Sequence, residues 1–547
     1  MKTLLTTLNA KYIHKSLSLR LLYVACKNNF DIDFIEYTIK DSTKDIVYDL
    51  LKQHADVIAF SVYIWNMEQI RDICCQLKRV KPELIIILGG PEVSYEIDYF
   101  LDTFTIDYII SGEGEEVFPA LLQELQKQRP IQIQGVSSKV IRDYRQTKPV
   151  NLQYIERLES PYVLPRDIQD MENRILYFET SRGCPYACQY CLSSLEKGLR
   201  FFSKEYITKQ LDMLLQSGVT IIKFLDRSFN AKVDHALFIL EYLSANYRPG
   251  MQFQFEINAD VLDQKIIDFF TKMAPSKVFR LEIGIQSTYE PTNKIVKRYQ
   301  DFERLSSVIQ QLQEIKKVDL HLDLIAGLPL ENKERFAKSF DDVFAFYPKE
   351  LQLGFLKLLR GTGLRKQYES YGYQFDQQAP YEIISSNDLT SQDIADIHLV
   401  EQMLEKYWNS GKFPLTMECL MYQTNSPFHL FLEIGKYYDK EQYKKIGYQI
   451  NELFLYLYHF SKHNQIEIMD VLIEDYLRLA KTKPKPWWPN VLTKTKMKQI
   501  MHTLAKELQL PPELVFRYGV LVRGIEYDIL AIYQNYQVEV YKLPIIK

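Results

Sequence analysis

This chain has few cysteines, no large excess of charge of either sign, and no long apolar run. The 547 residues include seven cysteines, an odd number, which argues against a disulfide scaffold and favours a reducing compartment. Lysine and arginine number 67 against 70 acidic residues, so no basic excess indicates a nucleic-acid partner. No apolar stretch reaches the roughly 18 residues that a membrane-spanning helix needs. We therefore expect a cytoplasmic protein that binds neither a membrane nor nucleic acid.

The beginning of the chain does not look like a targeting segment. Residues 1–9 contain too short an apolar run for a secretory signal peptide and continue directly into a folded pattern. The composition is ordinary for a globular protein, with 46% hydrophobic and 25% charged residues. At about 150 residues per domain, this length predicts three or four domains.

Three of the few cysteines lie close together in the sequence. Cys184, Cys188 and Cys191 have the spacing C-x3-C-x2-C. Thiolates are the soft ligands that iron–sulfur clusters require, and three of them can hold three irons of a 4Fe-4S cluster while the fourth iron stays open. A zinc site would need a fourth Cys or His nearby, and the other candidates are remote in sequence. We therefore predict an iron–sulfur cluster on this loop.

The first 134 residues alternate strand-like and helix-like segments. Apolar runs suited to buried parallel strands occupy residues 3–8, 33–37, 57–62, 84–88 and 108–110. Five strand–helix units predict an α/β domain with a flavodoxin-like parallel sheet, whose ligands bind beyond the carboxyl ends of the strands. Polar residues and glycines fall at those ends, among them Ser61, Gly89 and Gly90.

Residues 171–385 repeat a strand–helix pattern six times. The strand candidates are residues 175–180, 221–225, 252–257, 279–285, 321–326 and 351–356. Six such units predict a partial (β/α)6 barrel of the TIM type, with chemistry at the carboxyl ends of the strands. The cysteine loop directly follows the first of these strands. Polar residues follow the others, including Asp226, Glu256, Gln286 and Asp323.

Two regions carry less distinct patterns. Residues 135–170 have no clear period and contain three prolines, so we expect a linker. Residues 386–547 show helical patterns and aromatic stripes, which predict a mainly helical domain with an aromatic core. Within it we expect residues 481–489 to pack across helices and residues 530–542 to form a hairpin.

The cysteine loop resembles that of the radical S-adenosylmethionine (radical SAM) enzymes, in which SAM chelates the open iron. An aromatic residue, here Tyr190, precedes the last cysteine. The sequence from Ile283 to Gln286 resembles a fourth-strand signature, and that from Asp323 to Pro329 a fifth-strand signature, of the branch that includes the oxygen-independent coproporphyrinogen oxidase and cobalamin-dependent members. The resemblance implies reductive cleavage of SAM to methionine and a 5′-deoxyadenosyl radical.

The same resemblance implies roles for individual side chains. Gln286 and Asp323 would hold the ribose hydroxyls of SAM, Arg298 would pair with its carboxylate, and Glu256 would face it. An amide and a carboxylate suit a diol, and a guanidinium suits a carboxylate. Asp226 would help to grip the SAM amine, although the sequence around it departs from the family's Gly-Gly-Glu.

The N-terminal layout resembles the cobalamin-binding domain that precedes the radical SAM domain in many enzymes. The resemblance implies that Ser61, Gly89 and Gly90 contact the buried nucleotide tail of cobalamin. Domains that ligate cobalt through histidine carry D-x-H-x-x-G, and the nearest match, around His14, lacks both Asp and Gly. We therefore expect that no histidine ligates cobalt. The alternative that the domain is degenerate and binds no corrinoid stays open. The C-terminal part resembles an uncharacterised domain of one subgroup of these proteins.

The resemblance as a whole implies a radical SAM enzyme that methylates an unactivated carbon with cobalamin. Its partners would be a small-molecule or peptide substrate and an electron donor such as flavodoxin or ferredoxin. A corrinoid-independent rearrangement, cyclisation or oxidation is an alternative. A transfer-RNA methylthiotransferase is a second alternative, although the N-terminal domain lacks that class's second three-cysteine set. A non-enzymatic iron–sulfur sensor is a third.

Overall fold

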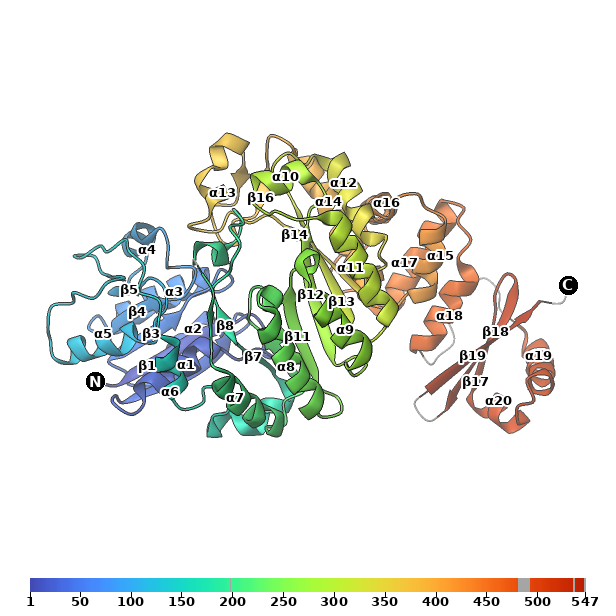
Figure 1. Cartoon of the computed structure of the whole chain (residues 1–547). Coiled ribbons are helices and arrows are strands. Elements are labelled where there is room, and N and C mark those ends of the chain that lie inside the picture. Colours follow the sequence, from blue (N-terminus) through green and yellow to red (C-terminus); the bar gives the residue numbers. More distant parts are fainter. Residues whose placement is uncertain (197, 481–491, 535–536, 546–547) are drawn as a thin grey trace. The chain divides into compact units, whose positions relative to one another are not determined.

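The computed structural model describes residues 1–196, 198–480, 492–534 and 537–545 (Figure 1). The chain forms two compact units: residues 1–332 with 354–390, and residues 333–353 with 391–547. In the part of the chain that the structure describes, no helix is both long and apolar enough to cross a membrane. The predicted packing of residues 481–489 lies outside the described residues.

The N-terminal part of the first unit is a six-stranded sheet with the order β2-β1-β3-β4-β5-β6. Its strands are β1 (Thr3–Asn9), β2 (Ile32–Thr38), β3 (Val57–Ser61), β4 (Ile85–Gly89), β5 (Tyr108–Ile110) and β6 (Val136–Ser137). Its helices are α1 (Leu17–Cys26), α2 (Thr43–Lys52), α3 (Met67–Val80), α4 (Ile97–Thr103) and α5 (Val117–Gln126). The first five strands pair in parallel, which confirms the predicted flavodoxin-like sheet. The antiparallel β6 was not predicted, because two residues give no periodic signal.

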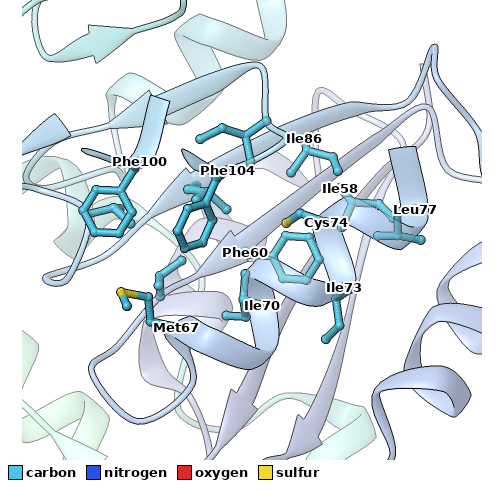
Figure 2. Close-up of a cluster of buried hydrophobic side chains, with 14 of the residues drawn as sticks. Ile58, Phe60, Met67, Ile70, Ile73, Cys74, Leu77, Ile86, Phe100 and Phe104 are labelled. Carbon is cyan, nitrogen blue, oxygen red and sulfur yellow. The ribbon is translucent and has the colours of Figure 1, made fainter. Parts of the chain in front are cut away.

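Apolar cores cover both faces of this sheet. Ile58 and Phe60 pack on one face with side chains of α3 and α4, including Phe100 (Figure 2). Val57 and Ala59 pack on the other face against α1 and α5. Successive residues of a strand point to opposite faces, so a strand that is buried on both sides reads as a continuous apolar run. The positions of these strands could therefore be predicted from the sequence.

A second six-stranded sheet has the order β14-β13-β12-β11-β10-β7, which follows the chain. Its strands are β7 (Ile175–Phe178), β10 (Ile221–Phe224), β11 (Gln252–Ile257), β12 (Phe279–Gln286), β13 (Asp319–Ala326) and β14 (Glu350–Phe355). The intervening helices are α7 (Lys204–Gln216), α8 (Val233–Asn246), α9 (Gln264–Lys272), α10 (Glu290–Ile295), α11 (Phe302–Ile315) and α12 (Lys333–Phe344). Pairing from β7 to β13 is parallel, so the predicted partial barrel is confirmed.

The predicted linker, residues 135–170, contains regular structure. It includes β6, the helix α6 (Leu152–Arg157) and most of a 3₁₀ helix at Pro165–Asn173. The buried carboxylate of Asp167 lies 2.9 Å from Lys15 Nζ and 2.7 Å from Arg20 Nε. These ion pairs anchor the 3₁₀ helix to α1 and the residues before it.

The second unit is mainly helical, as predicted. Besides α12 it contains α14 (Ser391–Met403), which continues as a π-helical segment at Leu404–Asn409, and then α15 (Pro414–Tyr422), α16 (Pro427–Lys440), α17 (Ile450–His463), α18 (Met469–Ala480), α19 (Lys494–Glu507) and α20 (Pro512–Tyr518). Aromatic side chains such as Tyr407, Tyr438 and Phe454 are buried in it. Its sheet has the order β17 (Gly519–Arg523), β18 (Tyr527–Gln534) and β19 (Gln537–Pro544). The expected hairpin is β18 and β19, and β17 was missed.

Candidate cofactor site

The cysteine loop lies between two short antiparallel strands that follow β7. These are β8 (Ser181–Arg182) and β9 (Arg200–Phe201). Ser194 Oγ donates to the carbonyl oxygens of Cys188 and Cys191, at 2.8 and 2.7 Å. The loop backbone between the second and third cysteines is therefore fixed from within.

The turn into the loop requires glycine. Gly183 has a φ of +90°, and a Cβ there would lie 2.0 Å from the carbonyl oxygen of Gly198. No other residue type fits this backbone position without displacing the loop.

The three thiols are free and lie near one another. Cys188 is buried, whereas Cys184 and Cys191 are partly buried. Burial raises the pKa of the Cys184 thiol, and the neighbouring Cys191 and Cys188 raise it further. Across the described ranges, no three His, Cys, Asp or Glu side chains already converge on one metal position. The donor set of three adjacent, unpaired soft ligands nevertheless fits an iron–sulfur cluster, toward which the thiols would turn.

Arg298 lies against the inner side of the cysteine loop. Its guanidinium donates to the Gly284 carbonyl, and its Nε donates to Gln300 Oε1 at 3.1 Å. Burial lowers the pKa of Arg298, but the adjacent Tyr190 and Cys188 raise it by more. The pKa therefore lies above its ordinary value, and the guanidinium is charged. A cation therefore lies beside the loop, where the resemblance expects the SAM carboxylate.

Gln286 ends β12 in a strained conformation with an unused acceptor. Its φ of +70° is uncommon for a residue other than glycine. Its Oε1 atom is buried and has no hydrogen-bond partner among the residues that the structure describes. An unsatisfied buried acceptor costs about 1–3 kcal/mol, which a ligand hydroxyl would recover. This orphaned oxygen fits the expected ribose contact of SAM.

Two further carboxylates of the expected SAM site lie on β13 and β11, the strands that flank β12. Asp323 Oδ1, on β13, lies 2.7 Å from His321 Nε2. Glu256, on β11, lies 3.5 Å from Arg227 Nη1. Burial raises the pKa of Glu256, Arg227 opposes this shift, and Asp323 adds to it. Glu256 and Asp323 are thus close enough for the charge of Asp323 to raise the pKa of Glu256.

Asp226 is hydrogen-bonded to the residues that lead into the cysteine loop. Its carboxylate is fully buried and accepts hydrogen bonds from Thr180 N–H at 3.0 Å, Thr180 Oγ1 at 2.6 Å and Ser181 Oγ at 2.5 Å. Burial raises its pKa to about 6. These hydrogen bonds brace the start of the cysteine loop, and contact of Asp226 with the SAM amine stays a prediction.

A cavity of about 570 Å³ opens at the carboxyl edge of the N-terminal sheet. Ser61, Gly89 and Gly90 line it at this edge, and Gly183 and Ser193 line it from the cysteine loop. Its apolar lining comes from the sheet and from the helices packed on it, through Leu5, Leu19, Leu22, Ala59, Ile87, Ile110 and Phe118. The cavity therefore reaches from the expected cobalamin contacts to residues that flank the three cysteines, whereas the cysteines and the expected SAM residues do not line it.

The two glycines at the sheet edge have different roles. A Cβ on Gly89 would meet no protein atom nearer than the Ile110 carbonyl oxygen at 4.0 Å, so it would project into free space. Gly90 has a φ of +112°, and its Cβ would lie 2.6 Å from the Val62 carbonyl oxygen. Gly90 is therefore required by the backbone, whereas Gly89 leaves room that a ligand such as the cobalamin tail fits. Ser61 Oγ lies 3.2 Å from Ser18 Oγ.

His14 does not line this cavity. Its Nδ1 atom lies 2.8 Å from the Tyr177 hydroxyl, within hydrogen-bond distance. Burial lowers the pKa of His14. The described residues that line the cavity include no histidine. These contacts support the expectation that no histidine ligates cobalt, which stays a prediction.

Sequence analysis missed a cluster of charges that joins the cysteine loop to the N-terminal sheet. Arg182, two residues before Cys184, lies 2.7 Å from Glu179 and 2.7 Å from Glu115. Glu113, which follows β5, pairs with Arg182 at 3.6 Å. The only sequence signal was a pair of glutamates after β5, which nothing linked to Arg182. This cluster fixes the two sides of the cavity relative to each other.

Three known domain families match the chain in series. The B12 binding domain family matches residues 4–122, and the Radical SAM superfamily matches residues 178–343. A family described as Protein of unknown function (DUF4080) matches residues 369–545.

Two curated proteins show similarity over much of this chain. The 2-(S-pantetheinyl)-carbapenam-3-carboxylate methyltransferase of Streptantibioticus cattleyicolor is 25% identical over 51% of this chain and 44% of its own length. The uncharacterized methyltransferase PH0819 of Pyrococcus horikoshii is 26% identical over 60% of this chain and 74% of its own. The chain thus spans less than half the length of the first relative.

A solved structure shares the fold. The cobalamin-dependent S-adenosylmethionine radical enzyme OxsB, with aqua-cobalamin bound, aligns with a TM-score of 0.61 and 15% identity, over 92% of this chain and 80% of that one. The chain therefore contains an N-terminal B12-binding domain followed by a radical SAM domain, as the fold and the cysteine loop also indicate. A DUF4080 domain follows these two domains on the C-terminal side.

Proposed function

We propose that the protein is a cobalamin-dependent radical SAM methyltransferase that methylates an unactivated carbon of a small-molecule or peptide substrate. The observation that carries this proposal is the single cavity bounded by Gly89 of the N-terminal sheet and by Gly183 and Ser193 of the cysteine loop. A methyl carrier and a radical generator must both reach one substrate carbon. A shared cavity meets that requirement, since groups bound on its two sides lie within reach of one substrate.

The cofactors are a 4Fe-4S cluster, SAM and cobalamin. When bound, they supply the electron, the radical precursor and the methyl carrier for the reaction. In our proposal the residues of the chain position them. Cys184, Cys188 and Cys191 hold three irons, and Tyr190 packs at the loop beside Arg298. The Arg298 guanidinium pairs with the SAM carboxylate, Gln286 and Asp323 accept from its ribose hydroxyls, and Glu256 faces it from β11.

A transfer-RNA methylthiotransferase would need a second set of three cysteines in the N-terminal domain. Cys26 and Cys74 are both fully buried, and they belong to the two apolar cores on opposite faces of the N-terminal sheet. Burial raises the pKa of the Cys26 thiol to about 12, so it is a poor source of thiolate. These two cysteines and Cys75 do not assemble a three-thiolate site. Measuring the corrinoid content of the purified protein distinguishes the corrinoid-independent alternative from the proposed cobalamin-dependent methylation.

Replacing Cys188 with alanine tests the cluster assignment. After anaerobic loading with iron and sulfide, the parent should hold about four irons per chain and cleave SAM when reduced. Cys188→Ala should lose the cluster absorbance and the cleavage and keep the parental circular dichroism. Cys419→Ala, at a partly buried cysteine of the second unit, is the matched control and should keep all three. Reductive SAM cleavage by Cys188→Ala at the parental rate would refute the proposal.

A further inference from the structure

Arg227, just beyond the end of β10, places a guanidinium on the wall of the cavity beside the cysteine loop. Its side chain is 51% exposed, and its ion pair with Glu256 joins Nη1 to Oε1 at 3.5 Å. Charged hydrogen bonds are shorter, at about 2.7–2.9 Å. Within the described part of the chain, Arg227 forms no other ion pair and donates no hydrogen bond. A guanidinium has five N–H donors, so Arg227 has donors available for a ligand.

The other described arginine on the cavity wall has a different environment. The Arg182 side chain is only 10% exposed, and its Nη2 atom lies 2.7 Å from both Glu115 and Glu179. These short pairs neutralise Arg182 and use its donors, as expected for an arginine that holds two parts of the fold together. Arg227 is exposed to the cavity and is not closely paired, so a structural role does not explain its position.

The backbone holds Arg227 firmly at the end of the strand. The preceding residue, Asp226, accepts hydrogen bonds from Thr180 and Ser181 and is 1% exposed. The following residue, Ser228, is also buried. A side chain whose backbone neighbours are fixed on both sides can bind a ligand with little loss of conformational freedom.

Arg227 lies between the two cofactor sites of the proposed function. Its partner Glu256 belongs to the expected SAM site, whereas Ser61 and Gly89 line the same cavity at the edge of the N-terminal sheet. A ligand on Arg227 would therefore lie between SAM and the corrinoid. The reacting carbon of the substrate has to lie there, because both cofactors must reach it.

The charges around Arg227 favour an anion with a single negative charge. A planar guanidinium matches a carboxylate through two parallel N–H···O bonds. An anion with several charges, such as a polyphosphate, would also face nearby carboxylates, and like charges repel. Carboxylates outnumber cations on the cavity wall, which carries Glu92, Glu113, Glu115, Glu179 and Glu196 against Arg182 and Arg227.

We propose that Arg227 binds the carboxylate of the substrate, which makes the substrate a carboxylic acid. This inference rests on the proposed function, because it places the substrate between SAM and cobalamin. Two other anions belong to that site, namely the SAM carboxylate and the phosphate in the cobalamin tail. Arg298 is the expected partner of the first, and the second belongs to the tail expected at Ser61 and Gly89. Binding is an ion pair with two hydrogen bonds, and no covalent bond forms or breaks.

A panel of monocarboxylic acids, each with its matched primary amide, tests this assignment. The panel covers aliphatic, aromatic and α-amino acids. Protein loaded with oxidised cluster, hydroxocobalamin and SAM is screened anaerobically by thermal shift, and the acids that stabilise it are measured by calorimetry. At least one acid should bind, and its uncharged amide should bind at least tenfold more weakly.

Two substitutions of Arg227 separate its charge from its shape. Arg227→Gln should bind the acid about as weakly as the parent binds the amide. Arg227→Lys should recover part of the affinity, because lysine keeps the charge without the planar fork. Arg304→Gln, at an exposed arginine of α11, is the matched control and should bind the acid as the parent does.

SAM affinity and corrinoid retention of Arg227→Gln show which anion the guanidinium binds. Both should stay close to the parental values. A loss of either would assign Arg227 to SAM or to cobalamin and overturn the proposal. Equal affinity of acid and amide, equal affinity of Arg227→Gln and parent, or a loaded parent that binds no acid of the panel would also overturn it. Cluster and corrinoid content are measured before the titrations, so a parent that holds neither, which would overturn the proposed function, is recognised separately.

Discussion

Asp226 couples the stability of the barrel to pH. Burial raises its pKa in the folded protein to about 6, above the ordinary value of 3.8. Between these values the folded chain keeps a proton that the unfolded chain has lost, so stability falls as pH rises through this window. A shift of about two units corresponds to about 3 kcal/mol.

Replacing Asp226 with asparagine should remove this pH dependence. Urea unfolding of parent and Asp226→Asn at pH 4 and pH 7.5 gives the comparison. The parent should lose about 2.5 kcal/mol more than the variant between the two pH values, because the unfolded carboxyl is already partly ionised at pH 4. Parallel pH profiles for the two proteins would show that the carboxyl titrates normally in the fold.

Arg298 is the residue on which SAM affinity should depend most directly. Arg298→Ala removes a charged partner of the SAM carboxylate and should weaken binding by about 1.5–3 kcal/mol, with the iron content unchanged. Arg304→Ala, at an exposed arginine of α11, is the control and should bind SAM as the parent does. Calorimetry of the cluster-loaded proteins measures the difference, and equal affinity would remove Arg298 from the site.

Residue types and spacing predicted part of this site but not the use of each atom. The cysteine spacing and the order of Gln286, Arg298 and Asp323 were visible in the chain. The sequence did not reveal that Thr180 and Ser181 already occupy the oxygens of Asp226, because these contacts form only when β7 and β10 pair. It also did not distinguish Gly89 from Gly90, because only the folded turn brings Val62 against Gly90.

Among the elements, parallel strands were the easiest to predict. Burial on both faces makes them continuous apolar runs, and their positions followed from that property. Two of the elements that were missed, β6 and β17, are short strands. Their positions depend on tertiary pairing, as β17 does on β18, instead of on a periodic pattern.

The 3₁₀ helix at Pro165–Asn173 should depend on its buried ion pairs with the N-terminal domain. Arg20→Ala leaves the Asp167 carboxylate with only Lys15 and should destabilise the first unit by about 3–5 kcal/mol, the usual cost of breaking a buried pair. Arg145→Ala removes an exposed pair with Asp143 and should leave the stability close to that of the parent. Urea unfolding measures both values. A similar small loss for both variants would show that the buried cluster does not anchor the 3₁₀ helix.

At the scale of the whole molecule, the cavity beside the cysteine loop could not be predicted from the sequence. Each fold was predictable from its own periodicity. The alignment of their ligand edges depends on contacts between distant residues, above all those of Arg182 with Glu113 and Glu115. Charged residues at strand ends carry no signal of which distant partner they meet.

Gly89 offers a way to close this cavity without disturbing the fold. In Gly89→Val the side chain should fill the space at the sheet edge, so that corrinoid affinity falls at least tenfold while the unfolding midpoint stays near that of the parent. Gly90→Val is the contrasting variant. It should lose stability, because its backbone conformation and Val62 exclude a side chain. Corrinoid retention by Gly89→Val at the parental level would place the ligand elsewhere.

The most direct test of the central claim is spectroscopy of the protein after anaerobic loading with hydroxocobalamin and desalting. The account predicts that the parent retains stoichiometric corrinoid beside its iron–sulfur cluster. In the reduced cob(II) state, its electron paramagnetic resonance spectrum should show no nitrogen superhyperfine splitting. His14→Ala should give the same spectrum, because His14 bonds Tyr177 outside the cavity. Loss of all corrinoid on desalting, or a nitrogen splitting that His14→Ala abolishes, would contradict the account.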